Sequence, residues 1–126
     1  MGTRDRGGNM ELTVAGTDRS GVPVVSVTGE VDVYTGPVLR EELEKALARG
    51  TTGVVVDLSG VAFIDSTGLG VLVTAHRQLA SRGGRLHVCA PEGKITSVIA
   101  LTGLDAVLAV HSALDDAVHA AAPASA

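Results

Sequence analysis

Apolar and polar residues follow two different periods along this chain. Glu11–Ala15 alternates polar and apolar residues, and Val22–Thr28 is an extended run rich in valine. Both patterns predict β-strands, because branched residues at a period of two suit a half-buried pleated surface. The intervening Thr17–Gly21 is polar and ends in glycine, which predicts a turn. We therefore expect the fold to open with a β-hairpin.

Helical and extended patterns alternate after the hairpin. Gly36-Pro37 predicts a helix start and Gly50 its end, since proline fits the first helical position and glycine fits a left-handed cap. The later elements are expected to be a strand at Val54–Leu58, a helix from Ser66 to Gly83, a strand at Arg85–Ala90, a helix at Glu92–Thr102, a strand at Val107–Val110 and a last helix after Ser112, where Asp115 completes a capping box.

The order β-β-α-β-α-β-α-β-α predicts an α/β fold, a single domain in which a mixed β-sheet packs with about four α-helices. The ordered domain is expected at residues 11–120. Residues 1–10 are polar and rich in glycine, and residues 121–126 read Ala-Ala-Pro-Ala-Ser-Ala, so we expect both ends to be disordered tails.

Composition excludes several classes of function. The net charge is −4 and there is no cluster of Lys and Arg, so no nucleic-acid partner is expected. No apolar run is long enough for a membrane span or a signal peptide, so no membrane partner is expected and a cytoplasmic protein is predicted. The single Cys89 and the scattered histidines offer no metal-ligand spacing, and no Gly-rich phosphate loop precedes a lysine. We expect neither a metal nor a cofactor.

Two polar loops follow predicted strands and carry the candidate chemistry. One holds Glu30 and Asp32, and the other holds Asp65, Ser66 and Thr67. Loops at the carboxyl ends of parallel strands share one edge of the sheet, so these five residues are expected to gather there. Ser66 stands where a helix begins. A hydroxyl at that point can cap the helix, and it is also well placed to carry a phosphate.

The neighbours of Ser66 allow two interpretations each. Asp65 either caps the helix or orients the serine hydroxyl. Glu30 and Asp32 are either solvated loop charges or parts of a docking face. Gly68 and Gly70 either let another backbone approach closely or simply pack against the sheet.

Catalysis is not predicted. Ser66 lacks the Gly-x-Ser-x-Gly elbow of a serine nucleophile, and His76 falls on the apolar stripe of its helix, which suits a packed histidine. A phosphoacceptor receiver domain is a rival, since Asp57 closes a valine-rich central strand. The opening hairpin and the lack of a lysine after Lys94 argue against that rival.

Two linked motifs carry a family resemblance. Thr28-Gly29-Glu30-Val31-Asp32 and the segment Phe63-Ile64-Asp65-Ser66-Thr67-Gly68-Leu69-Gly70, preceded by Val54–Ser59, resemble the STAS domain of bacterial anti-sigma factor antagonists. Their spacing and the β-β-α opening match as well, and the similarity covers about residues 11–120.

The resemblance implies a partner-switching protein of transcription regulation and stress response. An anti-sigma factor that is also an ATP-dependent serine kinase would bind it while it is unphosphorylated, would thereby release a sigma factor, and would switch the antagonist off by phosphorylating Ser66. A PP2C-type phosphatase would reset it. Thr67 places a second hydroxyl beside Ser66. The partner-binding residues implied by the motifs are Glu30, Asp32, Asp65, Ser66, Thr67, Gly68 and Leu69. The alternative is a non-switching STAS scaffold subunit of a sensory or lipid-transport complex.

Overall fold

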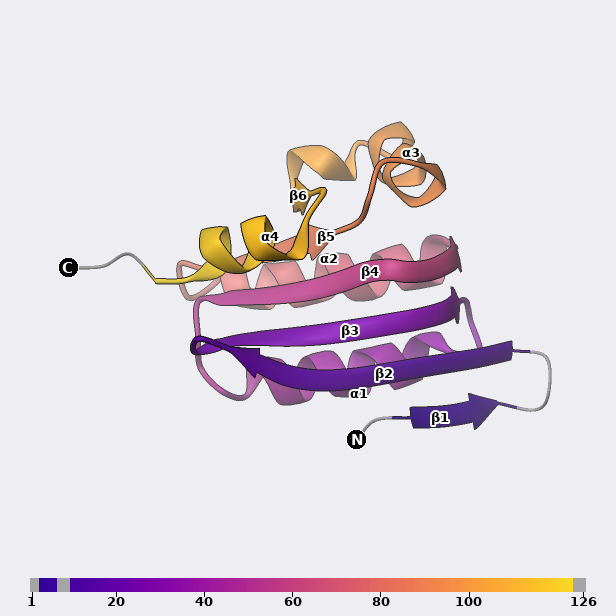
Figure 1. The fold of residues 1–126 in the computed structure, drawn as a ribbon, viewed down its shortest axis with the longest axis horizontal. Coiled ribbons are helices and arrows are strands. Elements are labelled where there is room, and N and C mark those ends of the chain that lie inside the picture. The colour runs from indigo at the N-terminus through magenta and orange to yellow at the C-terminus, as the bar shows by residue number, and fades with distance from the viewer. Residues whose placement is uncertain (1–2, 7–9, 124–126) are drawn as a thin grey trace.

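One mixed β-sheet organises the protein. The computed structural model describes residues 3–6 and 10–123, and within them six strands lie in the order β1-β2-β3-β4-β5-β6 (Figure 1). The elements are β1 (Thr3–Arg6), β2 (Met10–Arg19), β3 (Val22–Val31), α1 (Gly36–Leu47), β4 (Gly53–Ile64), α2 (Ser66–Ala80), β5 (Arg85–Cys89), α3 (Lys94–Leu101), a 3-10 turn (Leu104–Ala106), β6 (Ala109–His111) and α4 (Leu114–Ala121). No helix in the described part of the chain is long and apolar enough to cross a bilayer.

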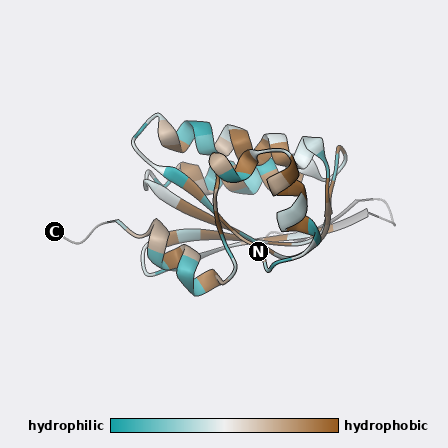
Figure 2. Cartoon of the chain, turned by 90° about the horizontal axis from the view of Figure 1, so that it is seen from above, coloured by the Kyte–Doolittle hydropathy of each residue, from teal (hydrophilic) through white to brown (hydrophobic). Residues whose placement is uncertain are grey.

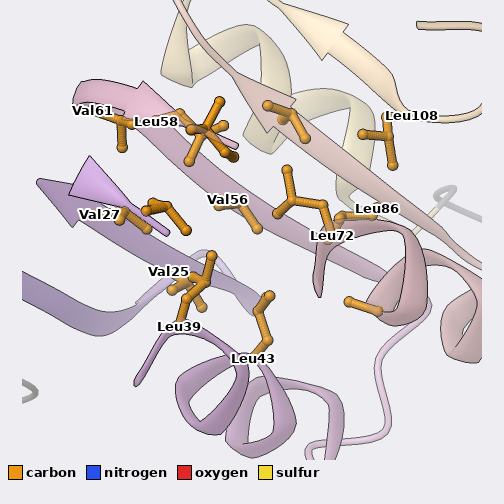
Figure 3. Packing of buried hydrophobic residues seen from close by; sticks show 14 of the residues in the cluster. Val25, Val27, Leu39, Leu43, Val56, Leu58, Val61, Leu72, Leu86 and Leu108 are labelled. Carbon is orange, nitrogen blue, oxygen red and sulfur yellow. The ribbon is translucent and has the colours of Figure 1, made fainter. Parts of the chain in front are cut away.

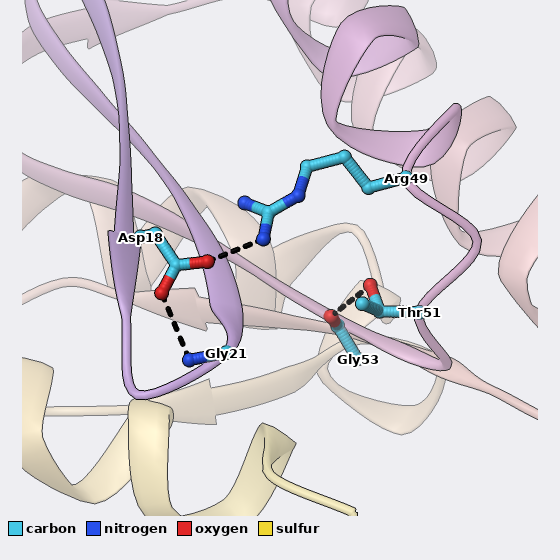
Figure 4. A network of polar contacts seen from close by, with 5 residues as sticks. All are labelled: Asp18, Gly21, Arg49, Thr51 and Gly53. Carbon is cyan, nitrogen blue, oxygen red and sulfur yellow. Dashed lines mark hydrogen bonds and ion pairs between the residues drawn. The ribbon is translucent and has the colours of Figure 1, made fainter.

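The opening hairpin is confirmed. β2 and β3 pair antiparallel, and the turn between them places Ser20 and Gly21 at φ values of 58° and 85°. Positive φ at both central residues is the conformation that matches the twist of a two-residue hairpin. Asp18 fastens this turn, because its carboxylate accepts the Gly21 N–H at 2.8 Å and pairs with Arg49 after α1 (Figure 4). That ion pair ties the hairpin to the first helix.

The rest of the sheet is parallel. β3, β4, β5 and β6 run in the same direction, and each crossover between them contains a helix. The predicted α/β class and the order β-β-α-β-α-β-α-β-α are therefore confirmed for the elements from β2 onward. Strand β4 is longer than the predicted Val54–Leu58, since it continues to Ile64.

The chain ends differ from the expectation of disordered tails. Thr3–Arg6 forms β1, which pairs antiparallel with β2. A ladder of backbone hydrogen bonds needs no apolar side chains, so a polar segment can complete an otherwise unpaired edge. At the other end, α4 continues to Ala121, which is buried. The remaining tail residues, 1–2, 7–9 and 124–126, lie outside the described residues.

The last helix also begins differently. It starts at Leu114 after an Ala113 cap that makes no side-chain hydrogen bond, so the predicted capping box between Ser112 and Asp115 does not form. Asp115 instead pairs with Arg19 of β2 at 2.7 Å. The carboxylate that would have closed the box is engaged in a contact between distant segments.

Aliphatic side chains fill both sides of the sheet. The larger cluster joins β3, β4 and β5 to α1, α2 and α3, and Figure 3 shows Val25, Val56, Leu39 and Leu72 meeting there. A smaller cluster packs α4 on the opposite face, against Val22, Val24, Val55 and Cys89. Hydrophobic and hydrophilic segments alternate along the helices in Figure 2, as amphipathic helices require. Burial raises the pKa of the Cys89 thiol, which agrees with an inert core cysteine.

Two bulges lie between β3 and β4. The pairing shifts between Ser26 and Thr28 and again between Gly29 and Glu30, each time with one extra residue in β4. The buried positions of β4 record both shifts, because the spacing of two changes to three at the end of the strand, in the series Val54, Val56, Leu58, Val61, Ile64. Bulges of this kind bend a strand and turn its end. They turn the end of β4 toward the edge of the sheet that carries the candidate site. We call this edge, formed by the loops that follow β3 and β4, the rim.

Candidate functional site

Asp65, and not Ser66, caps helix α2. The Asp65 backbone is extended, and its Oδ1 accepts the N–H groups of Thr67 at 2.9 Å and Gly68 at 3.2 Å. Its own N–H donates to the Val31 carbonyl at 3.1 Å, which ties the cap to β3. The cap interpretation of Asp65 is confirmed, and the cap interpretation of Ser66 is wrong. The helix can begin only where the pairing of β3 with β4 ends, so the end of that pairing determines that Asp65, and not Ser66, becomes the cap.

Ser66 is consequently the first residue of α2 and is exposed. Its hydroxyl makes no hydrogen bond to any residue that the structure describes, because Asp65 already satisfies the N–H groups a capping serine would use. An exposed hydroxyl without an internal partner is accessible to a modifying enzyme. A serine hydroxyl in this position can accept a transferred group such as a phosphate.

Asp32 organises the loop after β3 from within. Its side chain is only 7% exposed, and Oδ1 accepts the N–H groups of Tyr34 at 2.9 Å and Thr35 at 3.0 Å. The Thr35 hydroxyl accepts the Asp32 N–H at 2.9 Å and donates to the Glu30 carbonyl at 2.7 Å. The interpretation of Asp32 as a solvated charge is therefore wrong. Its carboxylate is turned inward, so it influences the rim through the shape of this loop.

The two predicted loops do meet at one edge of the sheet. Glu30 is the register neighbour of Phe63, and a Cβ on Gly36 would lie 3.1 Å from Thr67 Cγ2. Thr67 and Glu30 are both partly exposed. The expected gathering of Glu30, Asp32, Asp65, Ser66 and Thr67 is thus confirmed. The carboxylates of Asp32 and Asp65 hold the backbone of the two loops by hydrogen bonds.

The residues after Thr67 separate into core and surface. A Cβ on Gly68 would lie 2.6 Å from Val31 Cγ1, so Gly68 is a packing glycine. Leu69 is 6% exposed and belongs to the main core, so the structure places it beneath the surface that the motif implied for partner binding. The helical period explains this, because Leu69 begins the buried stripe of α2. Gly70 is exposed, with open space beside its Cα.

Three apolar side chains on the rim were not anticipated from the sequence. Val33, Tyr34 and Phe63 are 60%, 71% and 45% exposed. Val33 and Tyr34 follow β3, and Phe63 lies at the end of β4, three residues before Ser66. The available signal was their position within or beside the two motifs in a chain that has one tyrosine, one phenylalanine and no tryptophan.

The histidines lie away from the rim. His76 Nδ1 accepts the Leu86 N–H at 3.3 Å, which agrees with a packed histidine. His87 and His111 stack on neighbouring strands, with Nδ1 and Nε2 3.1 Å apart. Burial, with a contribution from the nearby His111, lowers the pKa of His87 to about 4. Within the described residues, no group of three or more His, Cys, Asp or Glu side chains is arranged to hold a metal ion.

Known proteins are similar to this chain in sequence and in fold. The STAS domain family model matches residues 14–117. The anti-sigma-F factor antagonist RsfB of Mycobacterium tuberculosis is 34% identical over 84% of this chain and 86% of its own length. The anti-sigma-B factor antagonist of Staphylococcus aureus is 33% identical over 81% of this chain and 94% of its own length. The crystal structure of an anti-sigma factor antagonist from Mycobacterium paratuberculosis superimposes with a TM-score of 0.82 at 36% identity, covering 88% of this chain and 94% of that protein.

The family match covers most of the chain, and the β-β-α opening and the Asp65-Ser66 helix start lie within it. This protein therefore belongs to the STAS domain family.

Proposed function

We propose that this protein is a cytoplasmic anti-sigma factor antagonist that binds an anti-sigma factor through the rim around Ser66 and thereby releases a sigma factor. Relatives that are 33–36% identical over more than four-fifths of the chain carry that name. The observation that carries the switch is the state of Ser66, which is exposed at the start of α2 while Asp65 caps the helix. We further propose that the anti-sigma factor is an ATP-dependent serine kinase and that it phosphorylates Ser66.

The capping arrangement makes Ser66 an effective switch position. A phosphate at a helix start would normally bond to free N–H groups there. Here the Asp65 carboxylate accepts the N–H groups of Thr67 and Gly68, so these donors are taken. The phosphate on Ser66 therefore keeps its charge of about −1.5 to −2 facing outward, toward a bound partner.

The size of the effect follows from the charge that the phosphate meets. A kinase holds the phosphates of its nucleotide and a catalytic carboxylate near the acceptor hydroxyl. A charge of about −2 at roughly 6 Å from one negative charge is repelled by about 1–5 kcal/mol for effective dielectric constants from about 80 down to about 20. Each 1.4 kcal/mol changes affinity about tenfold. Phosphorylation is therefore expected to weaken the complex from about tenfold to about a thousandfold without refolding the antagonist.

The same exposure allows the switch to be reset. A phosphatase must reach the phosphate that the kinase has left, and Ser66 is accessible on the first turn of α2. We assign this step to a PP2C-type phosphatase, which hydrolyses the phosphoserine and returns the antagonist to its binding state.

Phosphate mapping tests the proposal. The purified protein is incubated with the anti-sigma factor of the same organism and ATP, and the peptides are analysed by mass spectrometry. One phosphate on Ser66 is expected, with Thr67→Ala still modified and Ser66→Ala unmodified. Ser66→Ala should bind the anti-sigma factor constitutively, and Ser66→Asp should bind it weakly. Binding that is equal for Ser66→Ala and Ser66→Asp contradicts a switch at this residue.

The local character of the switch has its own test. Amide chemical shifts are compared before and after phosphorylation. Changes are expected in the loop after β3 and in the first turn of α2, which meet at Gly36 and Thr67. Shift changes that spread across the sheet to β5 and β6 would show that phosphorylation alters the whole fold, against the local mechanism.

A further inference from the structure

Both aromatic side chains of this protein lie at the candidate site and neither is in the core. The chain contains one tyrosine and one phenylalanine. Tyr34 is 71% exposed and Phe63 is 45% exposed, whereas Val, Leu and Ile build the buried clusters. Tyrosine and phenylalanine are enriched at the centres of protein interfaces and depleted on ordinary surfaces. Tyr34 follows β3 and Phe63 lies at the end of β4, the two segments that meet at this edge of the sheet, and this placement indicates a surface that is covered in a complex.

The backbone holds these side chains in place. The Asp32 carboxylate accepts the Tyr34 N–H, and the buried Thr35 hydroxyl closes the loop behind it. Phe63 stands in β4, paired with Glu30 of β3. A segment whose backbone is already fixed loses little additional backbone freedom on binding, so more of the apolar contact is retained as affinity. We call Val33, Tyr34 and Phe63 the aromatic rim.

The two chain segments that carry the aromatic rim contain charges of one sign. Residues 28–36 and 59–70 contain three acidic residues, Glu30, Asp32 and Asp65, and no lysine or arginine. Backbone N–H groups hold the carboxylates of Asp32 and Asp65. Among these three, Glu30 has a partly exposed side chain that makes no hydrogen bond or ion pair with any residue that the structure describes. A complementary surface would therefore place a cation opposite Glu30.

We infer that the aromatic rim is the affinity anchor of the complex, and that it inserts into an apolar pocket of the anti-sigma factor edged by a lysine or arginine that pairs with Glu30. This inference rests on the proposed function. The inference assigns two roles to one surface. The aromatic rim supplies most of the binding energy, and a phosphate on Ser66 supplies the charge that weakens binding. Removing a rim side chain should then weaken the Ser66→Ala and Ser66→Asp forms by a similar factor.

Titration of the purified anti-sigma factor from the same organism tests the inference. Tyr34→Ala and Phe63→Ala should each weaken binding about 30-fold or more, the range of an interface hot spot. Tyr34→Phe keeps the ring and should stay near wild type. Leu101→Ala is the matched control, since Leu101 is an 87% exposed apolar residue on α3, outside both loops. All four variants change exposed residues, so their thermal midpoints should stay near that of wild type.

The outcomes distinguish the inference from the proposed function. If wild type binds and Tyr34→Ala and Phe63→Ala bind no more weakly than Leu101→Ala, the inference is overturned while the proposed function stands. If wild type does not bind the anti-sigma factor, both are overturned. A concentration-dependent dimer of the wild type that Tyr34→Ala dissociates, measured by sedimentation velocity, would assign the aromatic rim to a second copy of the chain and would also overturn the inference.

Discussion

Two glycines in the same turn of α2 should respond to alanine in opposite directions. Gly68 and Gly70 both have helical backbone, so neither position requires glycine for its φ angle. They differ in what surrounds them. A Cβ on Gly68 would lie 2.6 Å from Val31 Cγ1 and 2.7 Å from Ile64 Cγ1, whereas a Cβ on Gly70 would meet nothing within 4 Å. We expect Gly68→Ala to destabilise the protein and Gly70→Ala to stabilise it.

The magnitudes follow from packing and helix propensity. Alanine in place of glycine inside a helix contributes about 0.8–1 kcal/mol, and at Gly70 nothing opposes that gain. At Gly68 the new methyl group presses on Val31 and Ile64, which are branched strand residues with restricted side-chain rotation. Overpacking of this kind costs about 1–3 kcal/mol. The net change for Gly68→Ala is therefore a loss of up to about 2 kcal/mol, against a gain of about 1 kcal/mol for Gly70→Ala.

Urea unfolding followed by circular dichroism measures both changes. The midpoint should fall for Gly68→Ala and rise for Gly70→Ala, with the slope of the unfolding free energy unchanged for both. For a chain of this length each kcal/mol corresponds to about 3–5 °C in thermal midpoint. The comparison is internally controlled, since the two substitutions add the same atoms to the same helix two residues apart.

A gain in stability for Gly68→Ala equal to that for Gly70→Ala would refute this reasoning. It would mean that Val31 and Ile64 move aside without cost, so the close approach of α2 to β3 and β4 would not constrain the helix start. A loss for both variants would contradict the open surroundings of Gly70 instead.

Three further predictions concern Thr35 and Asp65, which hold the two loops of the site, and His87, which lies away from them. Thr35→Val leaves the buried Asp32 N–H and Glu30 carbonyl unpaired and should lower the free energy of unfolding by about 2–4 kcal/mol in urea titration, while Thr35→Ser should restore most of it. Asp65→Ala should cost about 1 kcal/mol through the lost cap, whereas Asp65→Asn keeps an acceptor and should stay near wild type. Because burial lowers the pKa of His87 to about 4 from its ordinary 6.5, the unfolded chain binds more protons in that range; stability should be highest above pH 6.5 and should fall by roughly 3 kcal/mol toward pH 4.

Each of these predictions has a result that counts against it. Equal stabilities for Thr35→Val and Thr35→Ser would show that the hydroxyl contacts contribute nothing. An Asp65→Ala variant as stable as wild type would mean that solvent replaces the cap at no cost. For the histidine, His87→Gln removes the titrating group, so its stability should vary less with pH between 4 and 6.5; an unchanged profile would assign that dependence to other groups.

The order of elements could be predicted from the sequence because each element repeats a period that burial requires. Leu69, Leu72 and Leu79 mark the inner face of α2, and each is buried. The gathering of two loops at one rim also followed, since parallel strands present their carboxyl ends together. These features depend on the spacing of apolar residues along the chain, which can be read from the sequence alone.

The details of the site depend on contacts between distant segments. Asp65, Ser66 and Thr67 are three good capping residues in a row, and the bond from Asp65 N–H to the Val31 carbonyl selects the first of them. The burial of Asp32 depends on Thr35 closing its loop, and a carboxylate in a polar stretch otherwise reads as solvated. Strand β1 depends on a free edge of β2, which the polar segment itself does not reveal.

The two bulges in β4 have a consequence for how the motif can be transferred between proteins. Each bulge lengthens one step between buried positions of β4 from two residues to three, so deleting one residue between Leu58 and Phe63 would restore regular pairing with β3 and remove a bend, while Phe63 and Ile64 kept their faces. A chimera that copies residues 63–70 onto a STAS chain without these extra residues would carry the same motif at the end of a straighter strand, so the start of α2 would meet the sheet at a different angle. The two extra residues of β4 therefore belong with residues 63–70 in any transfer of the motif.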